Sequence, residues 1–125
     1  MEIITAPTAP GAVGPYSHAI VHNGMAFCSG QIPLDPVTMD ITGTTIETQT
    51  EQVMKNIAAV LKASGSSLDK IIKTTVFLST MDDFAGMNQV YEAALKGHKP
   101  ARSTFAVAGL PKSALVEIEC IAALG

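Results

Sequence analysis

The Asn23-Gly24 dipeptide constrains the fold more than any other feature of this sequence, because it separates two short runs of β-type residues. An Asn-Gly pair between apolar runs is the strongest short-range signal for a two-residue β-hairpin. We therefore expect residues 17–31 to form two antiparallel strands. The preceding residues 5–16 are rich in proline and glycine, which predicts an ordered but irregular segment.

The sequence after this hairpin predicts a helix. Apolar side chains recur at helical spacing from Ile46 to Leu61. Thr44 and Glu47 are three residues apart, which is the spacing of a capping box at the start of a helix. Ser64-Gly65 is a typical helix stop, because glycine readily adopts the left-handed conformation at a helix C-terminus.

A strand and a second helix are expected next. Residues 70–79 are β-branched and apolar on both faces, as in a strand buried at the centre of a sheet. Ser79 or Thr80 can then cap a helix whose apolar stripe runs from Phe84 to Leu95. Gly97 supplies the stop of this second helix.

The order of these elements predicts one α+β domain over residues 1–125. Two further strands, around Ala101–Val107 and Leu115–Ala122, follow the second helix. A hairpin, a helix, a strand, a helix and two strands predict a sheet with two helices on one face.

Charged residues make up only 15% of the chain, against roughly 25% in a typical soluble domain. We therefore expect part of the surface to be covered in an oligomer.

Composition and charge favour a cytoplasmic protein that binds neither membranes nor nucleic acids. No apolar run approaches the roughly 20 residues of a membrane-spanning helix, and the N-terminus lacks the pattern of a signal peptide. The net charge of −3, without a basic stripe, and the lack of tryptophan argue against nucleic-acid binding. Cys28 and Cys120 lie in apolar strands and are expected to be buried free thiols.

We also expect neither a metal nor another cofactor. His18 and His22 could share a strand face, but no third ligand lies near them in the sequence, and no Cys-x-x-Cys pair is present. The glycine-rich phosphate loops and the nucleophile elbow of serine hydrolases are also missing.

Arg102, Glu117 and Glu119 are charged residues within apolar, strand-like sequence. Arg102 is the only arginine. Its planar guanidinium can hold the carboxylate of a ligand with two hydrogen bonds. A salt bridge at the rim of the protein is an equally good interpretation. Glu117 and Glu119 share one side of their strand. Alternation favours a solvated face for them, and the other interpretation is a carboxylate that activates water in a cleft. Whether this side meets the one that carries Arg102 and Thr104 depends on the strand order.

Several other residues are candidates for lining a ligand site. Asn88 interrupts the apolar stripe of the second predicted helix, where it could be a satisfied boundary residue or could reach a ligand. Tyr16 follows the stiff Gly14-Pro15 turn. Ser29-Gly30 ends a strand, and a glycine there lets a ligand approach backbone donors.

Five segments, which together span nearly the whole chain, carry a family resemblance: GPYSHAI, SGQIPLDP, IIKTTVFLSTMDDFAGMNQVYEAAL, PARST and LPKSALVEIECIA. In this order they are similar to the Rid/YjgF family of enamine/imine deaminases. The resemblance implies a chorismate-mutase-like fold, a homotrimer with ligand clefts between subunits, and the core strand order 1-4-2-3, in which the last two strands do not pair. It also implies hydrolysis of reactive 2-imino acids, the tautomers of enamines such as 2-aminoacrylate, to 2-keto acids and ammonia.

The resemblance implies roles for particular residues. Arg102 matches the arginine that holds the substrate carboxylate, and Glu117, rather than Glu119, matches the carboxylate that positions or activates water. The residues that match the lining of the cleft are Tyr16, Ser29, Gly30, Asn88 and Thr104. Thr104 stands where many relatives have cysteine, although its hydroxyl can still donate a hydrogen bond. His18 stands where relatives often have glutamine, and we do not expect it to be catalytic.

This chemistry agrees with the residues. An imine is already electrophilic, so its hydrolysis needs a fixed substrate carboxylate, a water at the imine carbon and a group that moves protons. If Glu117 lies in an apolar cleft, its pKa should rise, which would suit it to proton transfer. Two alternatives are an endoribonuclease or translation-inhibitor activity, and a non-catalytic protein that binds small carboxylates.

Overall fold

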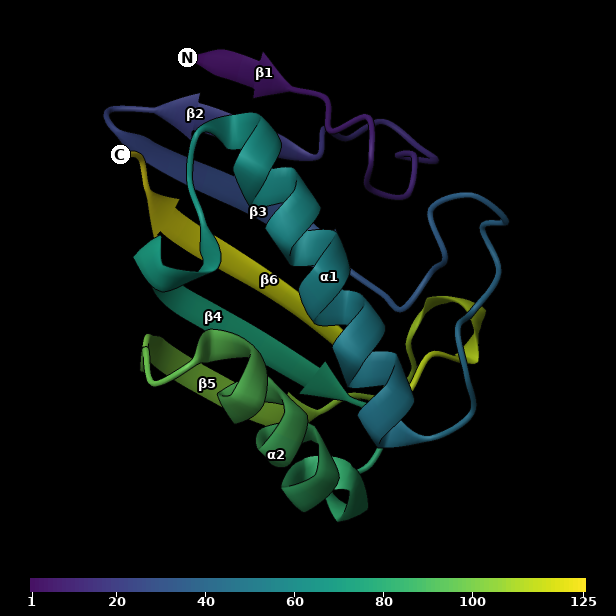
Figure 1. Cartoon of the computed structure of the whole chain (residues 1–125). Helices are drawn as coiled ribbons and strands as arrows, with labels where there is room; N and C mark the ends of the chain where they lie inside the picture. The colour runs from purple at the N-terminus through teal and green to yellow at the C-terminus, as the bar shows by residue number, and fades with distance from the viewer.

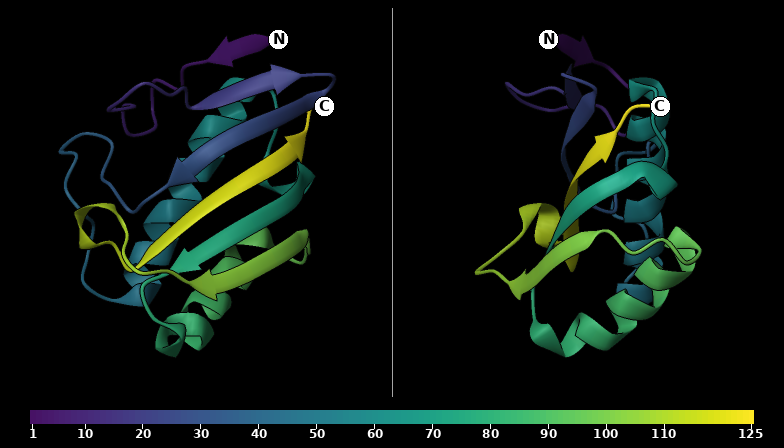
Figure 2. Two further views of the ribbon diagram at one scale, coloured as in Figure 1. Left: turned by 180° about the vertical axis from the view of Figure 1, so that it is seen from behind. Right: turned by 90° about the vertical axis from the view of Figure 1, so that its left-hand side faces the viewer.

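Six strands form one mixed sheet, and both helices pack on the same face of it (Figures 1 and 2). The computed structural model describes residues 1–125. Its elements are β1 (Glu2–Ile4), β2 (Ala19–His22), β3 (Met25–Gln31), α1 (Ile46–Ser64), β4 (Ile71–Leu78), α2 (Phe84–Leu95), β5 (Ala101–Ala106) and β6 (Val116–Ala123). This arrangement confirms the predicted α+β class with two helices on one face.

The spatial order of the strands is β1-β2-β3-β6-β4-β5. All neighbours are antiparallel except β4 and β5, which are parallel. The last strand, β6, therefore lies between β3 and β4 and does not pair with β5, which confirms the core order 1-4-2-3. No helix of the chain combines the length and the apolar character that a membrane span requires.

The hairpin is confirmed, and one strand was missed. Asn23 and Gly24 both have positive φ, 50° and 75°, as a two-residue turn between twisted strands requires. Residues 5–16 are irregular, as predicted. Strand β1 was not predicted, because three residues are too few to show alternation. It pairs with β2 through Ile3 and Ile20 at the edge of the sheet.

The helix ends differ slightly from the predicted ones. The predicted capping box of Thr44 and Glu47 is wrong by one residue: Thr45 is the N-cap of α1, and its Oγ1 accepts a hydrogen bond from the Thr48 backbone N–H at 3.2 Å. Gly65 ends α1 with a φ of 83°, as predicted. A short 3-10 turn (Met81–Asp83) precedes α2.

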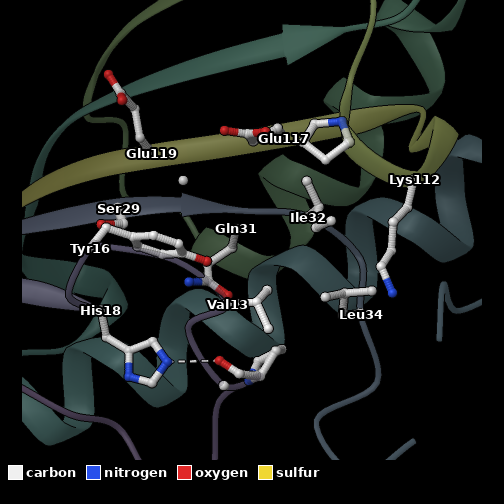
Figure 3. A pocket seen from close by; sticks show the side chains of 14 residues that line it. Val13, Tyr16, His18, Ser29, Gln31, Ile32, Leu34, Lys112, Glu117 and Glu119 are labelled. Carbon is white, nitrogen blue, oxygen red and sulfur yellow. Dashed lines mark hydrogen bonds between the residues drawn. The ribbon is translucent and has the colours of Figure 1, made fainter. Parts of the chain in front are cut away.

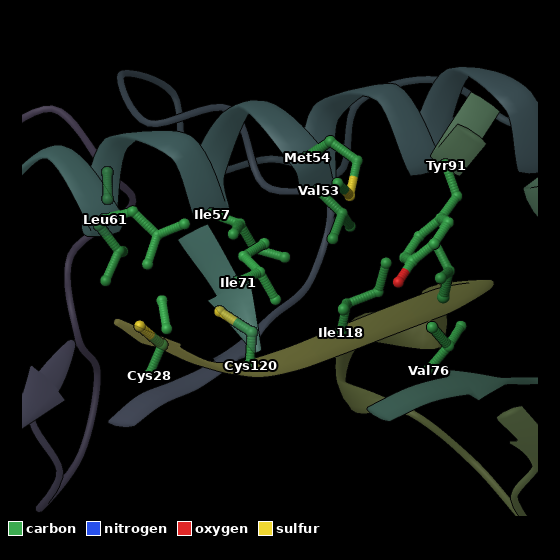
Figure 4. Packing of buried hydrophobic residues seen from close by; sticks show 14 of the residues in the cluster. Cys28, Val53, Met54, Ile57, Leu61, Ile71, Val76, Tyr91, Ile118 and Cys120 are labelled. Carbon is green, nitrogen blue, oxygen red and sulfur yellow. The ribbon is translucent and has the colours of Figure 1, made fainter. Parts of the chain in front are cut away.

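The hydrophobic core lies between the helices and the sheet (Figure 4). Ile57 and Leu61 of α1 are buried there against strand residues such as Val76. Residues 70–79 were expected to be buried on both faces, and this is wrong for the single chain. The face of β4 toward the helices is buried, whereas Phe77 on the opposite face is only half-buried.

One face of the sheet carries no helix (Figure 2), and aromatic side chains lie on it. Phe77 and Phe105 meet edge to face there, with ring centroids 5.4 Å apart. Phe27 and Phe105 are 41% and 45% exposed, although aromatic side chains gain more from burial than almost any others. We call this surface the open face, and it carries one of the two groups of predicted site residues.

Candidate functional site

Four of the predicted site residues line one cavity of about 540 Å³ (Figure 3). Tyr16 enters it from the irregular N-terminal segment, Ser29 and Gly30 come from the end of β3, and Glu117 comes from β6. The structure therefore brings together residues that lie as far as 101 positions apart in the sequence. The adjacent loops around Leu34 and Lys112 complete the wall.

Ser29 and Gly30 form a β-bulge, which explains how β3 bends at the cavity. Cys28 pairs with Cys120 and Gln31 pairs with Ile118, so two residues of β3 lie opposite one residue of β6. The Ser29 hydroxyl donates to the Ser17 carbonyl oxygen at 2.6 Å and anchors the bulge to the N-terminal segment. Such bulges often occur next to active sites, where they redirect side chains.

The Glu117 side chain lies directly against the backbone of Gly30. A Cβ atom at residue 30 would overlap a carboxylate oxygen of Glu117 and would lie 3.0 Å from its Cδ atom. The glycine was expected to let a ligand approach the backbone, and in this structure it gives room to the carboxylate of the neighbouring strand. Glycine is therefore needed here for space rather than for an unusual φ.

Two effects raise the pKa of Glu117 above its ordinary value of 4.5. Partial burial is the larger cause, because it disfavours the ionised form, and the nearby Glu119 carboxylate adds charge repulsion. The direction agrees with the expectation from the sequence. Glu119 itself is exposed, so the two glutamates of β6 differ in environment although they share one face.

Arg102 lies in a different place, against α2. Its Nη1 donates to Oδ1 of Asn88 at 2.6 Å. The guanidinium carbon lies 5.0 Å from the ring centroid of Tyr91 and 5.6 Å from that of Phe84, which is within the range of cation–π contacts. The helix therefore fixes the orientation of the guanidinium, beside a second cavity of about 450 Å³.

Arg102 and Glu117 lie on opposite faces of the sheet. Arg102 pairs with Thr74, whose hydroxyl bonds Tyr91 of α2 on the helix side, whereas Glu117 pairs with Phe77 on the open face. Strand spacing and rise place their Cα atoms roughly 14 Å apart. One chain therefore cannot bring both side chains to the same three- or four-carbon molecule.

Thr104 and His18 have contrasting environments. Thr104 follows Arg102 on the helix side of β5, and its buried Oγ1 has no hydrogen-bond partner. Both ring nitrogens of His18 are occupied: Nδ1 accepts from the Ala6 backbone N–H at 2.8 Å, and Nε2–H donates to the Pro10 carbonyl oxygen at 2.7 Å. His18 therefore holds the N-terminal segment in place.

No three His, Cys, Asp or Glu side chains are grouped where they could hold a metal ion.

The sequence missed three residues of these two sites. Tyr91 and Phe84 were assigned only to the apolar stripe of a helix, and their contact with Arg102 has no sequence signal because it depends on how β5 packs. Gln31 lines the Glu117 cavity and is 6% exposed. The bulge hides this position from simple alternation, because it adds one residue to β3.

The fold and the two groups of residues define a small α+β protein with two candidate half-sites. We call the cavity around Glu117 the acidic half-site and the surroundings of Arg102 and Asn88 the basic half-site. The sequence profile of the endoribonuclease L-PSP family matches residues 6–124. The chain belongs to this family, which is the Rid/YjgF family that its motifs resemble.

Two relatives show how names vary within this family. A Lactococcus lactis protein described as a candidate regulator, AldR, is 52% identical over 122 residues, which cover 98% of this chain and 97% of the relative. The 2-iminobutanoate/2-iminopropanoate deaminase of mouse is 38% identical over 124 residues, which cover 99% of this chain and 92% of the relative. Family membership alone therefore does not select an activity.

Solved structures share the whole fold. The crystal structure of Escherichia coli TdcF with bound serine superimposes with a TM-score of 0.95 at 40% sequence identity, and the match covers 100% of both chains. The agreement extends over the complete six-stranded sheet and both helices, so this chain has the fold of the family without an added or a missing element.

Proposed function

We propose that this protein is a hydrolytic deaminase of reactive 2-imino acids. Its substrates would be 2-aminoacrylate, 2-iminopropanoate and 2-iminobutanoate, and its products the 2-keto acids and ammonia. The observation that carries the proposal is the Glu117 carboxylate, whose raised pKa and position in a cavity beside Tyr16 suit it to move protons at a small ligand. The mouse relative, which is named for this activity, supports the proposal.

The proposed reaction assigns Glu117 the role of general base and then of general acid. A water attacks the imine carbon while Glu117 takes one of its protons, which forms a C–O bond and a tetrahedral carbinolamine. Glu117 gives this proton to the imine nitrogen and then moves the proton of the new hydroxyl to the same nitrogen, so the C–N bond breaks and ammonia leaves as the carbonyl forms. A positioned base of this kind typically contributes about 10²- to 10⁴-fold.

Arg102 would hold the substrate carboxylate. The guanidinium presents five N–H donors, and Asn88 accepts from only one of them in this structure, so a bidentate contact to a carboxylate can form. The contacts to Asn88 and Tyr91 hold the guanidinium before a ligand binds. In the solved TdcF structure the bound molecule is serine, an amino acid with such a carboxylate.

The complete site would form between subunits of a homotrimer. The separation of Arg102 and Glu117 by the sheet supports this, because a second chain can bring its own Arg102 to the Glu117 cavity. The exposed aromatic residues Phe27 and Phe105 on the open face supply apolar area that an interface would bury. We propose that this face packs against the edge of the next subunit.

The test is a coupled assay in which threonine dehydratase releases the imine and keto-acid formation is followed. We expect acceleration by the wild type, a loss of about 10²-fold or more in Glu117→Gln and Arg102→Ala, and no loss in the control Glu51→Gln on the exposed side of α1. Oligomer size is measured on the same samples. Full activity in either site variant, or in a monomer, would contradict the proposal.

Endoribonuclease activity is a second candidate, which the description of the family favours. The net charge of −3 weighs against it, because nucleic-acid binding depends on neutralising phosphates and should fall steeply with salt. Degradation of RNA by purified wild type, but not by Glu117→Gln, would favour this activity over imine hydrolysis.

A further inference from the structure

Three amide side chains are almost fully buried, and one of them has no hydrogen bond. Gln49 donates to the Gly43 carbonyl oxygen and accepts from the Leu115 backbone N–H. Asn56 donates to two backbone carbonyl oxygens of the loop after β3 and accepts from a neighbour on α1. Gln31, at 6% exposure, makes no side-chain hydrogen bond to another protein group.

The free amide of Gln31 faces the Glu117 cavity (Figure 3). The Gln31 side chain is buried as a whole, but its amide atoms are not among the fully buried unpaired ones, so they remain accessible from the cavity, where a ligand or a water can pair with them. Gln31 pairs with Ile118, so its side chain leaves β3 on the side of the sheet opposite Glu117. Because β3 ends at this residue, both side chains still line the one cavity, and Gln31 is the more deeply buried of the two. A ligand whose reacting carbon lies at Glu117 would therefore meet Gln31 with its far end.

The chemistry of this amide limits the group that it can recognise. A primary amide presents donors and an acceptor on one neutral plane, so it pairs best with another carboxamide or with a hydroxyl. Val13, Ile32 and Leu34 add apolar wall to a cavity that polar residues such as His18 and Lys112 also line. A cavity of about 540 Å³ is also larger than a three-carbon imino acid requires.

We propose that Gln31 is a specificity residue, which makes hydrogen bonds to a carboxamide or hydroxyl on the side chain of the 2-imino acid. This inference rests on the proposed deaminase activity and extends its substrates from the three- and four-carbon imino acids, whose side chains carry no polar group, to imino acids with a carboxamide or a hydroxyl. An alkyl side chain of the same size would leave the Gln31 amide unpaired in the filled cavity, and sites built to bond a polar group reject such analogues strongly.

The experiment compares two imines of nearly equal size. An L-amino-acid oxidase releases them from L-asparagine and from L-leucine, and semicarbazide traps whatever the protein does not hydrolyse. The measured quantity is kcat/KM for the asparagine imine divided by kcat/KM for the leucine imine. This ratio does not depend on the amount of folded protein, so partial misfolding of a variant does not affect it.

We expect the wild type to favour the asparagine imine and Gln31→Met to lower the ratio about tenfold or more. The control Gln89→Met, on the exposed side of α2, should keep the wild-type ratio. An unchanged ratio in Gln31→Met, with both imines still hydrolysed, would overturn the role of Gln31 and leave the deaminase intact. A wild type that is active in the threonine dehydratase assay but hydrolyses neither of these two imines would overturn this inference alone. Inactivity in that assay as well would overturn the proposed function itself.

Discussion

The surroundings of Arg102 and Glu117 differ in what they do to the charge. Arg102 lies against an amide oxygen and two aromatic rings of α2, all of which favour a cation. Glu117 lies over Gly30 and beside another carboxylate, and burial raises its pKa. The contacts of Arg102 therefore fix the position of its positive charge. The surroundings of Glu117 instead make protonation of its carboxylate easier.

Arg102 and Glu117 also differ in the position of their strands within the sheet. Arg102 belongs to β5, an edge strand, whereas Glu117 belongs to β6, which has a neighbour on each side. An edge strand can present its side chains to another molecule, and an interior strand can hold a cavity wall. Arg102 and Glu117 would therefore lie on opposite sides of the proposed contact between subunits.

The largest effect is expected when the two half-sites are inactivated in different chains. Arg102→Ala and Glu117→Ala should each be inactive alone. When the two are mixed by co-expression, about a quarter of the interfaces in randomly assembled trimers of the proposed kind would combine an intact Arg102 with an intact Glu117. Activity should therefore return to about a quarter of the wild-type value. A mixture that stays inactive would place both residues in a site within one chain.

The next largest effect is expected at Gly30. In Gly30→Ala the new methyl group would displace the Glu117 carboxylate, and a misplacement of about 1 Å can cost on the order of 10²-fold in rate. The measurement is kcat, with circular dichroism to verify folding. The matched control is Gly109→Ala, where a Cβ meets no atom within 4 Å. Equal rates in the two variants would contradict the close approach of Glu117 to Gly30.

A smaller effect is expected from the charge of Glu119. Glu117 must be ionised to accept a proton, so activity should fall as the pH drops through its raised pKa. Glu119→Gln removes one of the two causes of that raised pKa. The acid limb of the pH–rate profile should therefore move to lower pH, while the plateau rate stays unchanged. A limb that moves to higher pH, or a lowered plateau, would give Glu119 a different role.

The smallest effects are expected at two buried hydroxyls without partners, Thr50 and Thr104. Thr50 lies in the core, so Thr50→Val should raise the free energy of unfolding by about 1 kcal/mol, since it removes an unpaired buried hydroxyl at nearly constant shape. Thr104 lies beside Arg102, and there the same change should raise KM a few-fold. Denaturant titration measures the free energy of unfolding of both variants, and steady-state kinetics measures their KM. A raised KM in Thr50→Val with an unchanged KM in Thr104→Val would contradict the placement of Thr104 beside the ligand.

Local features were predictable from the sequence because they depend on neighbouring residues. The turn at Asn23-Gly24 and the stop of α1 at Gly65 follow from backbone preferences alone. The capping box was placed one residue early because several threonines at 44–48 offer similar hydroxyls, and only the backbone conformation selects Thr45. β1 was missed because three residues carry too little pattern.

The relation between the half-sites could not be predicted from periodicity. Alternation assigned Arg102 and Thr104 to one side of a strand and Glu117 to one side of another, but it gives no relation between strands. The family resemblance implied the strand order that the structure confirms. That order, with β4 between β5 and β6, separates Arg102 from Glu117 and could not be derived from either strand by itself.

The bulge at Ser29 and Gly30 decides which face of the sheet the end of β3 presents. Two residues of β3 lie opposite one residue of β6 there, so the pairing is shifted by one residue when it resumes at Gln31 and Ile118. A shift of one residue turns every following side chain of a strand to the other face. Without the bulge, regular alternation after Cys28 would therefore turn Gln31 toward the open face, while the pairing of residues 25–28 would stay the same.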